Sequence, residues 1–151
     1  MQIRFSPNQN DYQKLCTDGL RSNFLIETLF TAGKVELVYS DADRAIIGSA
    51  VPTTGALKLV TDAELRAAYF CERRELGVLN IGGSGTVEVD GKKYEMNKLD
   101  CLYISRGSKD ISFSSKDQAN PAAYYLLSYP AHAAYPTTLA TIKDAAPVEL
   151  G

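Results

Sequence analysis

The sequence predicts an all-β domain, either a barrel or a sandwich of two sheets. Three observations lead to this prediction. Short runs rich in branched and aromatic residues recur along the chain, turn residues such as glycine, proline and aspartate separate them, and few stretches have the period of a long helix. The chain has 151 residues, of which 45% are hydrophobic and 23% charged, which is the balance of one globular domain. No linker or internal repeat interrupts it, so we expect a single domain over residues 1–151.

The expected elements begin with a short helix. Residues 9–18 favour it, with Asn10 or Asp11 supplying the cap oxygen. Residues 61–70 favour a second short helix, with a long β-stretch that starts at Ala67 as the alternative. The remaining runs predict strands at residues 24–30, 35–40, 45–51, 56–60, 101–105, 110–115 and 122–129.

The clearest local signal is a β-hairpin at residues 86–95. Asp90 and Gly91 stand between two alternating runs, and both positions of such a two-residue turn need positive φ. The alternation sends Val87 and Val89 to the inner face of the sheet and their charged neighbours to water.

Composition and charge exclude several classes of partner. The formal net charge of −2 gives no reason to expect binding to nucleic acid or to an anionic membrane. No apolar run approaches the roughly 20 residues that span a bilayer, and the polar N-terminus lacks the apolar core of a signal peptide. We therefore expect a cytoplasmic protein.

The three cysteines agree with a reducing compartment, because their number is odd and no CxxC pair is present. They are Cys16, Cys71 and Cys101. Cys71 and Cys101 lie in apolar sequence surroundings, which favours buried core residues over reactive thiols.

Residues 69–91 contain a pattern with the spacing of a metal site. Glu75 is followed by an apolar run and, seven residues on, by a glycine-rich turn that starts at Gly82. This arrangement resembles the first motif of cupin barrels, in which two histidines one residue apart precede the glutamate. Residues 100–110 match the spacing of the second motif, which normally ends in a third histidine. The resemblance implies a cupin-type double-stranded β-helix barrel with one or two short helices.

The ligand positions of that motif are degenerate in this chain. Tyr69, Cys71 and Asp110 stand where the three histidines are expected, and only Glu75 keeps its residue type. Three neutral imidazoles and one carboxylate hold a divalent ion and leave positions open for substrate, which this set does not reproduce. The chain has one histidine, His132, so no other histidine site can be assembled. We expect neither a catalytic metal nor another cofactor in this chain.

Several longer segments carry a closer resemblance: DGLRSNFLIETLF, ELVYSDADRAIIG, ERRELGVLNIGGSGTVEVDG, PAHAAYPT and PVELG. With these segments the chain resembles the family of 5-keto-4-deoxyuronate isomerase, also called 4-deoxy-L-threo-5-hexosulose-uronate ketol-isomerase, over nearly its whole length. The resemblance implies a two-barrel enzyme of pectin and uronate breakdown that assembles as a homo-oligomer. It also places the zinc ligands, three histidines and a glutamate, in the second barrel. Since the chain stops at Gly151, we expect an N-terminal barrel that supplies scaffold and oligomer contacts.

The densest charge cluster, residues 72–75, holds the candidate substrate-binding residues Arg73 and Arg74. A guanidinium can bind the carboxylate of a uronate in a bidentate way. The alternative is a salt-bridge network, or a contact to the second barrel or to a neighbouring subunit. Strand alternation sends the two arginines to opposite faces, so only one of them can point into the barrel.

Two other functions stay open at this point. The first is a stand-alone, metal-free cupin that binds a small sugar acid or a partner protein. The second is a metal-free isomerase with Glu75 and Asp110 as its acid–base pair, because paired carboxylates do such work when their pKa values differ. His132 is expected to be structural or exposed. The run from Gly82 to Gly85 leads into a strand, which favours a turn over a phosphate site.

Overall fold

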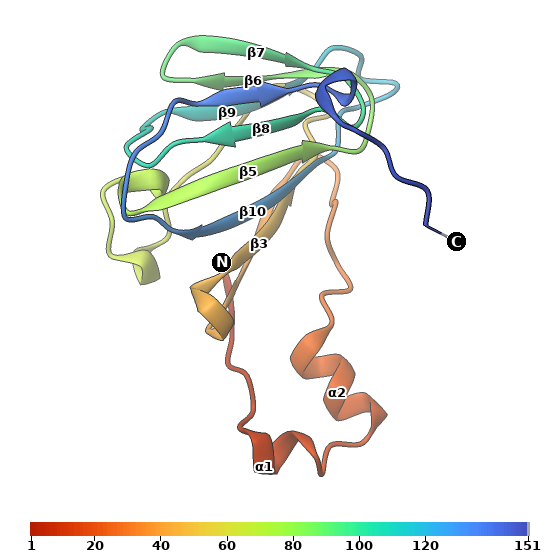
Figure 1. The fold of residues 1–151 in the computed structure, drawn as a ribbon, viewed down its shortest axis with the longest axis vertical. Helices are drawn as coiled ribbons and strands as arrows, with labels where there is room; N and C mark the ends of the chain where they lie inside the picture. Colours follow the sequence, from red (N-terminus) through yellow and green to blue (C-terminus); the bar gives the residue numbers. More distant parts are fainter. Residues whose placement is uncertain (151) are drawn as a thin grey trace.

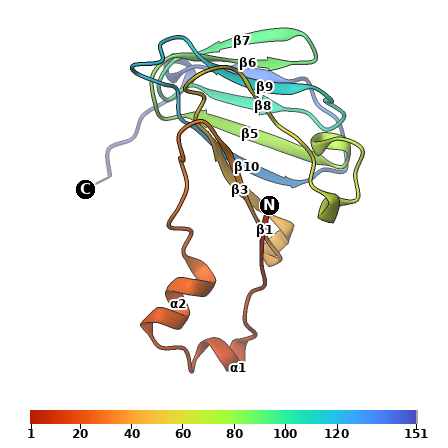
Figure 2. The ribbon, with the colours of Figure 1, turned by 180° about the vertical axis from the view of Figure 1, so that it is seen from behind.

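The computed structural model describes residues 1–150, and two sheets dominate it (Figures 1 and 2). The larger sheet has the strand order β1-β2-β3-β10-β5-β8-β11, and the smaller has the order β4-β9-β6-β7. The strands are β1 (Gln2–Arg4), β2 (Val35–Ser40), β3 (Ile46–Ala50), β4 (Leu57–Lys58), β5 (Arg74–Asn80), β6 (Gly85–Val89), β7 (Lys92–Met96), β8 (Cys101–Ile104), β9 (Ile111–Ser115), β10 (Tyr124–Pro130) and β11 (Thr138–Ala140). The 3₁₀ turns are η1 (Ala42–Arg44), η2 (Ala63–Leu65), η3 (Phe70–Glu72) and η4 (Ile142–Asp144). Only β1 and β2 pair in parallel; the other ladders are antiparallel.

One hydrophobic core fills the space between the two sheets. Strand β5 shows the period of two most clearly, because Leu76 and Val78 are fully buried while their neighbours are partly exposed. Phe113 of the smaller sheet packs against Tyr124 of the larger, with 5.4 Å between the ring centroids. The prediction of an all-β barrel is therefore confirmed.

The predicted hairpin is confirmed as the connection from β6 to β7. Asp90 and Gly91 have φ values of 49° and 83°, as a two-residue turn with positive φ at both positions requires. Val87 and Val89 are buried, so the predicted alternation holds as well. The strand predicted over residues 35–40 forms with the predicted bounds as β2, and the other predicted strands form with shifted or shorter bounds, except the one over residues 24–30.

The strand predicted over residues 24–30 is wrong. Phe24 ends a helix instead, and the residues after it belong to no ladder. β1, not this run, takes the place beside β2 at this end of the larger sheet. The run itself lies in a part of the chain that extends away from both sheets (Figures 1 and 2), so it pairs with no strand.

The N-terminal helices also differ from the prediction. The chain forms α1 (Gln9–Tyr12) and α2 (Thr17–Phe24) in place of one helix over residues 9–18. The cap of α1 is Asn8, earlier in the chain than predicted, and its side chain accepts two backbone N–H groups.

The helix predicted over residues 61–70 is wrong too. Only the short 3₁₀ turn η2 forms there, with Asp62 as its cap. Arg66 follows with φ 46°, in the left-handed region, and a residue in that region cannot continue a right-handed helix. The alternative, a β-stretch from Ala67, is wrong as well, because the strand begins only at Arg74.

The segment of residues 5–30, called the N-terminal arm below, extends away from the two sheets (Figures 1 and 2). Neither of its helices contains a buried residue. Phe5 is 72% exposed and Phe24 is 57% exposed. The arm therefore adds nothing to the core of its own chain.

The cysteine predictions hold for one residue and fail for another. Cys71 is buried as predicted, and burial raises the pKa of its thiol to about 12. Cys101 is exposed, which contradicts its predicted place in the core. The reason is strand alternation in β8, because Leu102 and Ile104 take the inward positions. Over residues 1–150, no helix is both long and apolar enough to cross a membrane.

Candidate functional site

The degenerate cupin positions do not converge on one point. The Tyr69 ring lies against the Lys109 ammonium, 5.9 Å from ring centroid to nitrogen, and Cys71 lies in the core. Asp110 is exposed, and its backbone N–H donates to the Asp90 carboxylate at 2.9 Å. Within the described residues, no group of three or more histidine, cysteine or acidic side chains could hold a metal ion.

Glu75 points away from the barrel interior. Its neighbours Arg74 and Leu76 on β5 are buried, so the alternation places Glu75 on the outer face of the larger sheet. There its carboxylate accepts a hydrogen bond of 2.9 Å from the Tyr103 hydroxyl. Asp110 precedes β9 in the smaller sheet, so the structure does not bring Glu75 and Asp110 together.

The two candidate arginines differ in burial, as predicted, but strand alternation is not the reason, because Arg73 precedes β5 with φ −130° and ψ 13°. Arg73 is exposed, and its guanidinium donates to the carbonyl oxygens of Leu65 and Arg66 at 3.0 and 2.6 Å. Arg74, with only 7% of its surface exposed, points inward at the start of β5. Of the two arginines, only Arg74 is therefore buried.

The guanidinium of Arg74 is held by uncharged oxygens. Its Nε donates to the Ser128 hydroxyl at 3.1 Å, and its Nη2 donates to the carbonyl oxygens of Ser128 and Arg44 at 2.9 and 2.5 Å. Burial is the main cause that lowers the pKa of Arg74, and the groups that raise it are Tyr39 and Cys71, not a carboxylate. The ion pairs found in residues 1–150 are Met1–Asp62 and Arg21–Glu27, so no acidic side chain neutralises Arg74.

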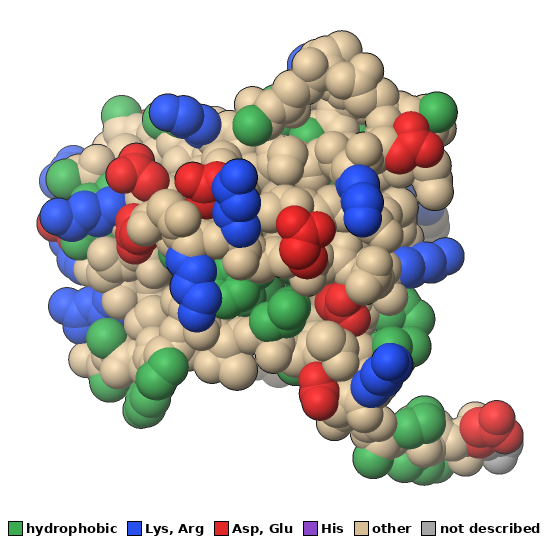
Figure 3. Space-filling view, turned by 90° about the horizontal axis from the view of Figure 1, so that it is seen from above, with side chains coloured by type: hydrophobic (Ala, Val, Ile, Leu, Met, Phe, Trp, Pro, Cys, Tyr) green, Lys and Arg blue, Asp and Glu red, His purple; other side chains and the backbone are tan. Residues whose placement is uncertain are grey.

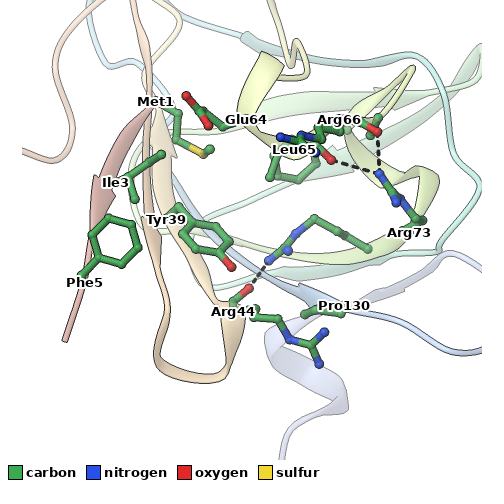
Figure 4. Close-up of a pocket in the computed structure, with 13 residues that line it drawn as sticks. Met1, Ile3, Phe5, Tyr39, Arg44, Glu64, Leu65, Arg66, Arg73 and Pro130 are labelled. Carbon is green, nitrogen blue, oxygen red and sulfur yellow. Dashed lines mark hydrogen bonds between the residues drawn. The ribbon is translucent and has the colours of Figure 1, made fainter. Parts of the chain in front are cut away.

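Arg74 lines a cavity of about 460 Å³ at the end of the barrel where β5 begins and β10 ends (Figure 4). Three more arginines and one glutamate line it, all exposed: Arg44, Arg66, Arg73 and Glu64. The rest of the wall is mainly apolar and aromatic, from Met1, Ile3, Phe5, Tyr39, Leu65, Ala67, Phe70 and Pro130. We call this cavity the arginine pocket. By contrast, the face over β6 and β7 carries acidic and basic side chains intermixed (Figure 3).

The sequence pointed to Arg73 and Arg74 but missed Arg44 and Arg66. Arg44 ends η1 and Arg66 directly follows η2, with φ values of 55° and 46°. They lie 30 and 8 residues from Arg74 in the chain, and no motif joins them to it. Only the folding of η1 and η2 against the start of β5 brings them to one cavity.

The other residues singled out in the sequence have structural roles. His132 is exposed, and its carbonyl oxygen accepts from Arg106 Nη1 at 3.1 Å. A Cβ atom on Gly83 would lie 2.0 Å from the Asn120 carbonyl oxygen, so this position has no room for a side chain. The glycine run is therefore a tight turn that leads into β6, as predicted.

Two facing sheets of this topology define a cupin-type barrel. The cupin domain of Schizosaccharomyces pombe Cnp3 superposes with a TM-score of 0.51 over 70% of both chains, at 11% sequence identity. The pattern of the KduI/IolB family matches residues 24–151, and the chain belongs to this family.

Two curated relatives match over the whole chain. The 4-deoxy-L-threo-5-hexosulose-uronate ketol-isomerases of Lachnoclostridium phytofermentans and Halalkalibacterium halodurans are 49% and 46% identical to it. Each match covers 100% of this chain but 55% of the relative, so the chain spans about half the length of these relatives.

Proposed function

We propose that this chain is the N-terminal barrel of a ketol-isomerase that acts on 4-deoxy-L-threo-5-hexosulose uronate in the breakdown of pectin-derived uronates. Similarity to curated ketol-isomerases along the entire chain carries this proposal. Because those relatives are nearly twice as long, we assign scaffold and subunit contacts to this barrel. The metal-dependent chemistry is assigned to the remaining length of such proteins.

The ligand positions in this barrel do not fit the zinc that the family resemblance implies. Zinc ligands are deprotonated N, S or O atoms that converge at roughly 2.0–2.3 Å from the ion. Cys71 lies in the core, while Glu75 faces outward and bonds to Tyr103. We therefore derive no step of the reaction through a metal in this barrel.

The same geometry argues against a metal-free acid–base pair. A ketol-isomerase moves a proton between adjacent carbons, which needs a base within hydrogen-bond reach of the substrate. Glu75 and Asp110 belong to different sheets and do not face one space. We assign neither carboxylate a catalytic part.

An isomerase assay on 4-deoxy-L-threo-5-hexosulose uronate, with and without added zinc, tests the proposal. We expect no turnover from the 151-residue chain alone. We expect turnover after fusion to the segment that follows the matched region in the Lachnoclostridium phytofermentans relative. Turnover by the chain alone would contradict the scaffold assignment. A folded, zinc-loaded fusion without activity would contradict the assignment to a ketol-isomerase.

The N-terminal arm supports the subunit contacts in this proposal. Helices of four and eight residues are too short to be stable in water without packing. Leu20, Phe24 and Leu25 are nevertheless exposed on this arm. We propose that a second copy of the chain covers these side chains, which removes them from water and stabilises both helices.

Light scattering coupled to gel filtration tests this contact. We expect the chain to be a dimer or a larger oligomer, and the double variant Leu20→Ser, Phe24→Ser to be a monomer. Lys14→Ser, an exposed polar position in the same arm, serves as the control and should leave the mass unchanged. A monomeric wild-type chain would refute the contact.

Location in the cytoplasm is also part of the proposal. The three cysteines are all free, which supports a reducing compartment. Fractionation of the source cells followed by immunodetection would check it, and recovery from a secreted fraction would contradict it.

A further inference from the structure

Arg74 carries a buried positive charge that no acidic side chain of residues 1–150 neutralises. A guanidinium has five N–H donors, and those on Nε and Nη2 meet oxygens of Ser128 and Arg44. Nη1 donates to no described protein atom and is not among the buried atoms without a partner, so it reaches solvent through the arginine pocket. Burial of a charge is unfavourable unless an opposite charge or hydrogen bonds replace the water. Nη1 is therefore the part of the buried guanidinium that a ligand in the pocket can reach.

The rim of the pocket favours negative charge as well. Arg44, Arg66 and Arg73 surround the same cavity, and Glu64 is the one acidic side chain among its lining residues (Figure 4). Arg73 is fixed by two backbone carbonyl oxygens, so its orientation is set before any ligand arrives. Four arginines against one glutamate give a cavity with a strongly positive potential.

The size and the apolar wall of the pocket restrict the ligand further. A volume of about 460 Å³ falls within the roughly 300–1,000 Å³ of small-molecule sites. Tyr39 and Phe70 add aromatic surface to the lining of the pocket. An inorganic ion would leave this surface without a contact, and an extended acidic segment of a protein would not need a buried floor arginine. A compact molecule with one carboxylate and a ring or chain of carbons can contact both the arginines and the apolar wall.

We propose that the arginine pocket is a binding site for a small organic carboxylate of the sugar-acid class, with its carboxylate on Arg74 Nη1 and the rim arginines. This site is separate from the metal-dependent reaction assigned to the rest of the relatives' length. The choice of a sugar acid among small carboxylates rests on the proposed function. The anionic character of the ligand rests on the four arginines alone.

Isothermal titration of the 151-residue chain with D-galacturonate, D-galactose and inorganic phosphate tests the proposal. We expect galacturonate to bind at least about tenfold more tightly than galactose, because a charge-assisted, bidentate contact is lost in the neutral sugar. Phosphate should bind more weakly than galacturonate. Equal binding of the two sugars, or binding of neither, would overturn the proposal. Tighter binding of phosphate would overturn the assignment to a carboxylate.

Variants of the pocket give the second test. Arg44→Gln and Arg66→Gln remove exposed rim charges and should each weaken galacturonate binding by about two- to fivefold. Arg74→Lys keeps the charge but loses the planar fork, and we expect a loss of about tenfold or more. Lys98→Gln, an exposed position outside the pocket, should change nothing.

Unchanged affinity in the two rim variants would overturn the site, and these variants decide the question if Arg74→Lys fails to fold in a thermal melt. The binding readout needs no turnover. A fusion that isomerises substrate while the pocket binds no carboxylate would refute only the pocket, and the reverse result would refute only the isomerase.

Discussion

Replacement of Asn80 by alanine should lower the free energy of unfolding by about 2–4 kcal/mol. Asn80 ends β5 and is fully buried. Its Nδ2 donates to the carbonyl oxygens of Gly83 and Met96 at 2.8 and 3.2 Å, and its Oδ1 accepts from the N–H groups of Gly82 and Ala123 at 3.1 and 3.3 Å. A neutral hydrogen bond contributes a net of about 0.5–1.5 kcal/mol, and the two longer bonds here count at the lower end, which gives the stated range.

The magnitude matters because one side chain holds three separate segments together. Asn80 ties the glycine turn after β5 to β7 and to the residue before β10. In Asn80→Ala these backbone groups stay inside the protein, where water replaces the lost partner poorly. A loss of about 2–4 kcal/mol would be a large part of the roughly 5–15 kcal/mol that stabilises an ordinary domain.

Urea unfolding followed by circular dichroism measures this loss. The control is Asn23→Ala, which removes one side-chain bond of 2.8 Å to the Gly19 carbonyl oxygen in the N-terminal arm. We expect this control to cost less than about 1 kcal/mol, since its surroundings are only half-buried. If Asn80→Ala costs no more than the control, the four bonds do not act as a buried network and the reasoning fails.

Three further outcomes are expected. Tyr124→Phe removes a hydroxyl that donates to the Ser114 carbonyl oxygen at 2.9 Å and should cost about 1 kcal/mol in the same urea titration, so an unchanged midpoint would contradict it. Iodoacetamide at pH 8 should modify Cys16 first, because backbone hydrogen bonds lower the pKa of this exposed thiol. Cys101 should react next, because partial burial raises its pKa, and Cys71 should react only on unfolding. Mass spectrometry of timed digests measures this order. Above pH 9 the free energy of unfolding should fall because of Cys71, whose pKa rises from 9.0 to about 12 on folding. The native thiol keeps a proton that the unfolded chain releases, which costs up to about 1.4 kcal/mol per pH unit. Cys71→Ala should therefore flatten the decline of the urea midpoint between pH 9 and 11.

The sequence by itself determined the β-class of this protein and its strongest local features. The hairpin at Asp90 and Gly91 follows from a turn that only residues tolerant of positive φ allow. The burial of Val87 and Val89 follows from the period of two along a strand. These features depend on neighbours in the chain, so their physics is readable without the fold.

Where local preference and the fold disagreed, the fold decided. Residues 24–30 have the composition of a strand, but β1 takes the place beside β2 and this run lies in the N-terminal arm, away from both sheets. Residues 61–70 have a helical pattern, but the left-handed Arg66 turns the chain back toward β5. Cys101 lies in an apolar stretch but faces outward, because Leu102 takes the inward position of β8.

Only the tertiary structure decided the candidate site. Spacing placed Glu75 and Asp110 in one predicted ligand set, yet Glu75 lies on the outer face of the larger sheet and Asp110 precedes a strand of the smaller sheet. Arg44, Arg66 and Arg74 share no motif, yet two short turns fold over the start of β5 and bring them to one cavity. Convergence of distant residues depends on how strands pair and loops close, and a pattern between sequence neighbours contains no information about either.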